Sequence, residues 1–138
     1  MEKEAIYSPR APRGRGAYTP AVKVGPWIYV SGQIPIDPTT NEITGTTVEE
    51  QTHRILTNIR ELLETGGSSL DQVVKVTAYL ANLQDFDAYN RVYATYFTGV
   101  LPARTTVQAG LRGILVEIDA IAVAPDAGAG AAAAHIAP

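Results

Sequence analysis

The sequence predicts one α+β domain of two layers, in which two helices cover one face of a mixed sheet. The chain has 138 residues, which is enough for one domain and too few for two. Its hydrophobic pattern gives the element order β-β-α-β-α-β-β. Each helix joins two strands, which favours right-handed crossovers onto a single sheet and places both helices on the same face.

Two strands are predicted in the first third of the chain. Residues 18–24 (YTPAVKV) form a short strand, and residues 27–33 (WIYVSGQ) are a run of aromatic and β-branched residues typical of a strand. Residues 1–17, with two prolines and three arginines, are predicted to be an irregular arm. Residues 35–45 carry two prolines and Asn41 and are predicted to be a loop.

Two helices are predicted from residues at helical spacing. The first follows Thr47, which forms a capping box with Glu50, and it ends at the Gly-Gly pair at 66–67. The second follows Asp85 and is stopped by a glycine and a proline before residue 103. The positions that define the spacing are Val48, Thr52, Ile55, Leu56, Ile59, Leu62 and Leu63 in the first helix, and Phe86, Tyr89, Tyr93, Tyr96 and Phe97 in the second.

Three more strands are predicted, at residues 73–80, 104–109 and 115–123. With both helices on one face, the other face of the sheet is uncovered and carries apolar side chains from nearly every strand. We expect an oligomer to bury that face. The domain is predicted to span residues 18–124, followed by a disordered Ala/Gly/Pro tail at residues 125–138.

Composition narrows the classes of function. The net charge of -3 gives no general attraction for nucleic acid or an anionic membrane, and no apolar run is long enough to span a bilayer. The absence of cysteine excludes disulfides, thiolate metal sites and thiol nucleophiles. The two histidines, His53 and His135, lie far apart, so no metal site is expected. The first residues contain no apolar signal segment, so a cytoplasmic protein is expected.

Two charged residues in the last predicted strands are candidates for chemistry. Arg104 follows a proline-marked turn, and its planar guanidinium suits a carboxylate. Glu117 lies between Val116 and Ile118, where desolvation makes a carboxylate more basic, although a nearby Arg104 would oppose that shift and leaves its net direction open. On pattern alone, a solvent-facing arginine and a structural ion pair remain open for these residues. If the last two strands pair as a hairpin, the two side chains could together bind an acid and move a proton.

Several stretches resemble one family when taken together. They are AYTPAVKVGPWIYVSGQIPIDP, the helix EEQTHRILTNIRELLETGG, the segment FDAYNRVYATYF, and the strands LPARTTVQ and VEIDAIAV. Between about residues 18 and 123 the chain resembles the RidA/YjgF family of enamine/imine deaminases. The resemblance implies a chorismate-mutase-like α+β fold and a homotrimer with active sites between subunits. It also implies hydrolysis of small 2-imino acids to 2-keto acids and ammonia without metal or organic cofactor.

The same resemblance assigns roles to individual residues. Arg104 would bind the substrate carboxylate, and Glu117 would position and activate the attacking water. The residues expected to line the substrate site are Tyr18, Ser31, Gly32, Asn90 and Thr106. Thr106 stands where many members of the family have a cysteine, and the loop between Arg104 and Glu117 is shorter than usual.

Two alternatives remain open at this point. The PRGRG sequence in the arm is similar to that of the 2-aminomuconate deaminases of aromatic catabolism, which would imply a larger substrate. The second alternative is a non-catalytic trimer of the same fold that binds small ligands or RNA. The acidic balance argues against RNA, because the only basic cluster consists of Arg10, Arg13 and Arg15.

Overall fold

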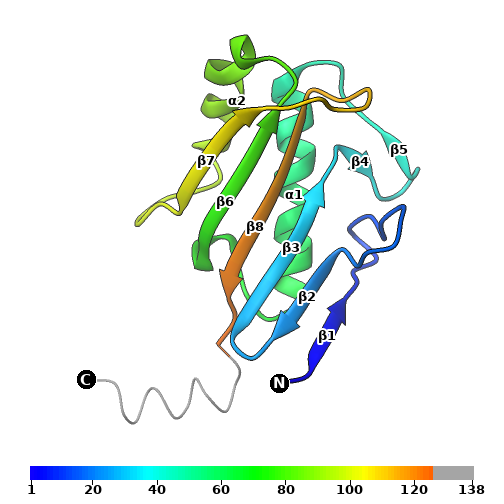
Figure 1. Cartoon of the computed structure of the whole chain (residues 1–138), viewed down its shortest axis with the longest axis vertical. Coiled ribbons are helices and arrows are strands. Elements are labelled where there is room, and N and C mark those ends of the chain that lie inside the picture. Colours follow the sequence, from blue (N-terminus) through cyan, green and yellow to red (C-terminus); the bar gives the residue numbers. More distant parts are fainter. Residues whose placement is uncertain (126–138) are drawn as a thin grey trace.

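A six-stranded sheet with two helices on one face makes up the computed structural model of the chain, which describes residues 1–125. The strand order is β1-β2-β3-β8-β6-β7, and both helices lie behind the sheet in the view of Figure 1. This arrangement is the predicted two-layer α+β class. Beyond residue 125, the predicted tail lies outside the described residues.

The predicted strands are all present, with small shifts at their ends. The strands of the large sheet are β1 (Lys3–Ile6), β2 (Ala21–Val24), β3 (Trp27–Gln33), β6 (Val73–Leu80), β7 (Ala103–Gln108) and β8 (Val116–Val123). Strands β6 and β7 pair in parallel, and every other neighbouring pair is antiparallel. A parallel pair needs a crossover connection, which α2 (Phe86–Tyr93) supplies.

Two segments differ from the prediction. Part of the arm predicted to be irregular forms β1, which pairs with β2 along Lys3–Ile6. The segment predicted to be a loop contains a small hairpin, β4 (Ile36–Asp37) with β5 (Glu42–Ile43), whose turn places Asn41 at a positive φ of 60°. Neither segment has enough alternating apolar residues to be recognised as a strand, since only Ile6 of β1 is buried.

The first helix, α1 (Val48–Thr65), has the predicted start and end. The Glu50 N–H donates to the Thr47 hydroxyl oxygen at 3.1 Å, and the Glu50 carboxylate accepts from the Thr47 N–H at 3.1 Å, which completes the capping box. At the other end the Gly66 N–H donates to the Leu62 carbonyl. Both ends of α1 are therefore capped as the sequence predicts. None of the helices among residues 1–125 is both long and apolar enough to cross a bilayer.

Helix α2 is shorter than predicted, because it ends at Tyr93 and not near residue 98. After it, the Thr95 and Tyr96 N–H groups bond to carbonyls three residues back, and the Thr95 hydroxyl also donates to the Val92 carbonyl at 2.7 Å. Such hydroxyl bonds compete with the helical pattern and tighten the last turn. The 3₁₀ turns η1 (Leu70–Gln72) and η2 (Leu83–Asp85) complete the described elements.

The core lies between the helices and one face of the sheet. Along β8 the alternate residues Val116, Ile118, Ala120 and Ala122 are buried beneath the helices. Among residues 1–125, no helix or second sheet covers the opposite face (Figure 1). Apolar side chains lie on it: Trp27 is 39% exposed and Tyr29 is 47% exposed. The predicted uncovered apolar face is therefore present.

Candidate active site

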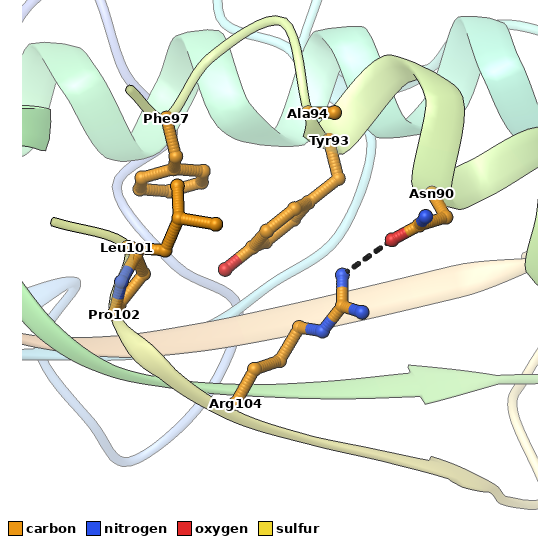
Figure 2. A pocket seen from close by; sticks show the side chains of 7 residues that line it. All are labelled: Asn90, Tyr93, Ala94, Phe97, Leu101, Pro102 and Arg104. Atoms are coloured by element: carbon orange, nitrogen blue, oxygen red, sulfur yellow. Dashed lines mark hydrogen bonds between the residues drawn. The ribbon is translucent and has the colours of Figure 1, made fainter. Parts of the chain in front are cut away.

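Arg104 lies near the start of β7, the edge strand next to β6. Its partner in the parallel register is Val76, which is fully buried beneath the helices. Arg104 therefore points to the helix side of the sheet, toward α2, as Figure 2 shows. There its Nη1 donates a hydrogen bond to Asn90 Oδ1 at 2.8 Å. The structure thus brings together two of the predicted site residues.

Aromatic rings of α2 hold the guanidinium in place. The guanidinium carbon of Arg104 lies 4.5 Å from the ring centre of Tyr93 and 5.5 Å from those of Phe86 and Tyr89. Each cation–π contact of this kind stabilises the arginine by about 0.5–2 kcal/mol, depending on desolvation. Asn90 is the hydrogen-bond partner of the guanidinium among residues 1–125. The remaining N–H groups are available to a ligand, and the cation is held by the rings before the ligand arrives.

A cavity of about 440 Å³ opens beside Arg104 (Figure 2). Its lining residues are Asn90, Tyr93, Ala94, Phe97, Leu101, Pro102 and Arg104. The cavity therefore has one cationic, hydrogen-bonding end and one apolar wall, which suits a small organic acid. The sequence predicts Tyr93 to be a core residue and gives no signal that Leu101 lies at the site. Helical spacing is the sequence signal that could place Tyr93 at the site, because it lies three residues after Asn90 on the same helix face.

Glu117 lies on the other face of the sheet. Its neighbours in β8, Val116 and Ile118, are buried beneath the helices, so Glu117 points to the uncovered face. It faces Gly32 of β3, where a Cβ atom would collide with the Glu117 carboxylate. The register between β3 and β8 shifts between Val30 and Gln33, as in a β-bulge. Only glycine leaves room for the carboxylate at this position.

Burial raises the pKa of Glu117, and the negative charge of Asp119 raises it further. Asp119 lies two residues along the same face of β8, where it accepts a hydrogen bond from the Tyr79 hydroxyl at 3.2 Å. Tyr79 is the cross-strand partner of Glu117 on β6. A carboxylate in these surroundings is a stronger base than one in water. Such a carboxylate is better able to accept a proton near neutral pH.

Within one chain, Arg104 and Glu117 do not meet. The prediction that the last two strands form a hairpin is wrong, because β6 lies between β7 and β8. The α2 crossover pairs β7 in parallel with β6, and β8 then inserts between β6 and β3. The two side chains are also on opposite faces, with Arg104 toward α2 and Glu117 toward the uncovered face. Each chain therefore carries the predicted site residues in two separate groups, the half-site around Arg104 and the half-site around Glu117.

The half-site around Glu117 contains three other predicted residues. Tyr18 and Gly32 line a small cavity next to the arm. The Tyr18 hydroxyl accepts a hydrogen bond from the Arg15 N–H at 3.1 Å, and its ring stays half exposed. The Ser31 hydroxyl donates to the Thr19 carbonyl at 2.6 Å. Because that proton is already used, Ser31 ties β3 to the segment before β2 and offers a ligand its hydroxyl lone pairs only.

Thr106 belongs to the half-site around Arg104. It lies two residues further along β7 on the same face, and its hydroxyl oxygen is 3.3 Å from the Tyr89 hydroxyl oxygen. His53, for which no metal-binding role is predicted, has its Nδ1 2.9 Å from the Tyr96 hydroxyl, where α1 packs against the turn after α2. Within residues 1–125 there is no group of three or more His, Cys, Asp or Glu that could hold a metal ion.

The fold and the two half-sites define a small α+β protein with an arginine-lined cavity at its sheet edge and a partly buried carboxylate of raised pKa on its open face. The family model described as Endoribonuclease L-PSP matches residues 8–124. The chain therefore belongs to this family, the RidA/YjgF family, which confirms the resemblance found in the sequence.

Three relatives illustrate the range of similarity. The chain is 48% identical to RutC family protein SSO3206 of Saccharolobus solfataricus, over 87% of this chain and 97% of that protein. It is 41% identical to the 2-iminobutanoate/2-iminopropanoate deaminase of Mus musculus, over 88% of this chain and 91% of that protein. A solved structure of E. coli TdcF with bound serine matches with a TM-score of 0.81 and 33% identity, over 87% of this chain and 98% of that chain.

Proposed function

We propose that the protein is a cofactor-free deaminase that hydrolyses reactive 2-imino or enamino acids to 2-keto acids and ammonia. The observation that carries this proposal is Arg104, held by Asn90 and three aromatic rings at the end of a cavity sized for a small acid. The 41% identity to a 2-iminobutanoate/2-iminopropanoate deaminase supports the same chemistry.

In the proposed reaction, Arg104 binds the substrate carboxylate and so fixes the C=N carbon. Glu117 accepts a proton from water as the water oxygen attacks that carbon, which gives a tetrahedral carbinolamine. The proton then passes to the nitrogen, the C–N bond breaks, and ammonia leaves with formation of the C=O bond. Imino acid and water thus become keto acid and ammonia with no change of oxidation state. A protonated imine is already electrophilic, so placement and one proton transfer suffice.

The two half-sites must come from different subunits for this reaction to occur. We propose a homotrimer in which the Glu117 face of one chain closes on the Arg104 edge of its neighbour. The uncovered apolar face supports this assembly, because Trp27 and Tyr29 on that face are large and partly exposed in a single chain. Tyr18 and Gly32 would then line the cleft from the same side as Glu117.

The test is a coupled assay in which a second enzyme releases 2-iminopropanoate and the formation of keto acid is timed. The protein should accelerate keto-acid release, and Arg104→Ala should abolish the acceleration. Arg112→Ala is the matched control, because Arg112 lies exposed in the loop before β8. If Arg104→Ala is as active as the unchanged protein, the proposed carboxylate clamp is wrong.

One observation favours the alternative of a larger substrate. Pro12 and Gly14 of the arm line the same small cavity as Tyr18 and Gly32, so the arm borders the Glu117 half-site. A 2-aminomuconate-type substrate could then contact the arm. Comparison of the rates with 2-aminomuconate and 2-iminopropanoate distinguishes the two, and a large preference for 2-iminopropanoate would exclude the alternative.

The arginines on which an RNA-binding role would depend are engaged within the chain. Arg10 forms an ion pair with Glu61 at 3.0 Å, and the Arg13 guanidinium carbon lies 4.7 Å from the ring centre of Tyr7. The third, Arg15, donates to the carbonyl of Asn41. These contacts tie the arm to its own domain, which favours a structural role for the basic cluster.

A further inference from the structure

Two tyrosines of α2 lie against Arg104, but their hydroxyl groups differ. The Tyr89 hydroxyl oxygen is 3.3 Å from the Thr106 hydroxyl oxygen. The Tyr93 hydroxyl is buried and has no hydrogen-bond partner among residues 1–125, and Tyr93 as a whole is only 6% exposed. A buried hydroxyl without a partner costs about 1–3 kcal/mol, and such groups are rare in folded proteins. The Tyr93 hydroxyl therefore does not contribute to stability, and its burial points to a role in function.

The position of Tyr93 indicates its partner. Figure 2 shows its side chain reaching from α2 into the cavity it shares with Arg104, with the hydroxyl on the side of Leu101 and Pro102. The Arg104 guanidinium carbon lies 4.5 Å from the Tyr93 ring centre, and both residues line the same cavity. Leu101 lines the same cavity and is 62% exposed, so little packing holds its side chain and it can move aside for a ligand.

The protonation state of Tyr93 suits a hydrogen-bond donor. Burial raises the pKa of Tyr93 to about 12, with a further contribution from Tyr89, although the charge of Arg104 opposes the shift. The hydroxyl thus keeps its proton at neutral pH. A neutral O–H donates to a carboxylate without repelling it, and a carboxylate has lone pairs for both an arginine and a second donor.

We infer that Tyr93 is a substrate-binding residue whose hydroxyl donates to one carboxylate oxygen of a 2-keto or 2-imino acid while Arg104 binds the other oxygen. This inference rests on the proposed function, which it deepens by adding a second donor to the carboxylate site. The Tyr89 hydroxyl differs from that of Tyr93 because it already has a partner, the Thr106 hydroxyl at 3.3 Å. The apolar wall formed by Phe97, Leu101 and Pro102 then lies beside the rest of the ligand.

The test is calorimetric titration of the full-length protein with pyruvate, a stable 2-keto acid. Tyr93→Phe should raise the Kd for pyruvate by about tenfold, as expected for loss of a hydrogen bond to a charged group. Tyr96→Phe is the matched control, since it removes a tyrosine hydroxyl from the turn after α2 whose partner is His53 and not Arg104, and it should leave the Kd for pyruvate within about twofold.

Thermal unfolding separates binding from structure. Tyr93→Phe removes an unpartnered buried hydroxyl, so its Tm should equal or exceed that of the unchanged protein while pyruvate binding is weakened. If Tyr93→Phe binds pyruvate with unchanged affinity and Arg104→Ala does not bind it, the role of Tyr93 is overturned and the carboxylate clamp stands. If Arg104→Ala also binds pyruvate normally, both the inference and the proposed clamp are wrong.

Discussion

Gly32 and Glu117 face each other across β3 and β8, and a methyl group on Gly32 would occupy the space of the Glu117 carboxylate. The obstacle is the end of a flexible side chain, so Glu117 can move aside without disrupting the sheet. The position of the proposed catalytic base thus depends on the absence of a side chain on the neighbouring strand. A larger residue at position 32 can therefore displace Glu117 and leave the stability of the fold nearly unchanged.

Gly32→Ala should lower kcat for keto-acid release by at least about tenfold, because the water-activating carboxylate moves out of place. The Tm should change little. The matched control is Gly110→Ala, since a Cβ at Gly110 meets no atom within 4 Å and its φ is not positive. A Gly32→Ala variant with full activity would mean that the observed position of Glu117 is not needed.

Asp119 should set the pH dependence of the reaction. Its charge is one of the causes that raise the pKa of Glu117, the larger being burial. Glu117 acts as a base only when it is ionised, so removal of the neighbouring charge lets it ionise at lower pH. In Asp119→Asn, the acid limb of the kcat/KM profile should therefore shift to lower pH. An unshifted limb would show that Asp119 does not act on the catalytic ionisation.

Glu117→Gln should abolish turnover and leave stability at neutral pH equal or higher. The folded-state pKa of Glu117 is raised, so the folded protein favours the protonated form. Its contribution to stability is therefore most favourable at low pH and is lost as the pH rises through the folded-state pKa. Gln mimics the protonated group at every pH, so the Tm difference between the variant and the unchanged protein should grow with pH. A lower Tm for the variant at neutral pH would contradict this.

The sequence predicts the fold class and indicates candidate site residues, but it does not predict where those residues lie relative to one another. The capping box at Thr47 and the alternating pattern of β8 are local signals, and the structure has both. The pairing of β6 with β7 and with β8 depends on contacts between residues far apart in the sequence. The registers of these two pairs place Arg104 and Glu117 on opposite faces of the sheet. For the same reason the sequence does not predict that Asn90 bonds to Arg104, because this bond depends on how the crossover helix packs and not on spacing along the chain.

Asn90→Ala should weaken pyruvate binding by about five- to tenfold, because Arg104 loses the hydrogen bond at 2.8 Å that orients its guanidinium. The aromatic rings remain, so binding should be reduced and not lost. Asp87→Ala on the exposed side of the same helix is the control, and its affinity should match that of the unchanged protein. Equal affinities for all three proteins would show that the rings alone orient Arg104.

Disruption of the uncovered face should remove activity without any change to the site residues. Tyr29 lies on this face of β3, opposite Val22 of β2, and is half exposed in a single chain. Tyr29→Arg would place a charge in an apolar interface between subunits, at a cost of several kcal/mol if it is buried unpaired. Light scattering should then show monomers in place of the proposed trimer, with loss of keto-acid release because Arg104 and Glu117 no longer meet. Glu64→Arg on the exposed side of α1 should stay trimeric and active. A monomeric Tyr29→Arg variant with full activity would place the reaction within one chain, which contradicts the opposite orientation of its two half-sites.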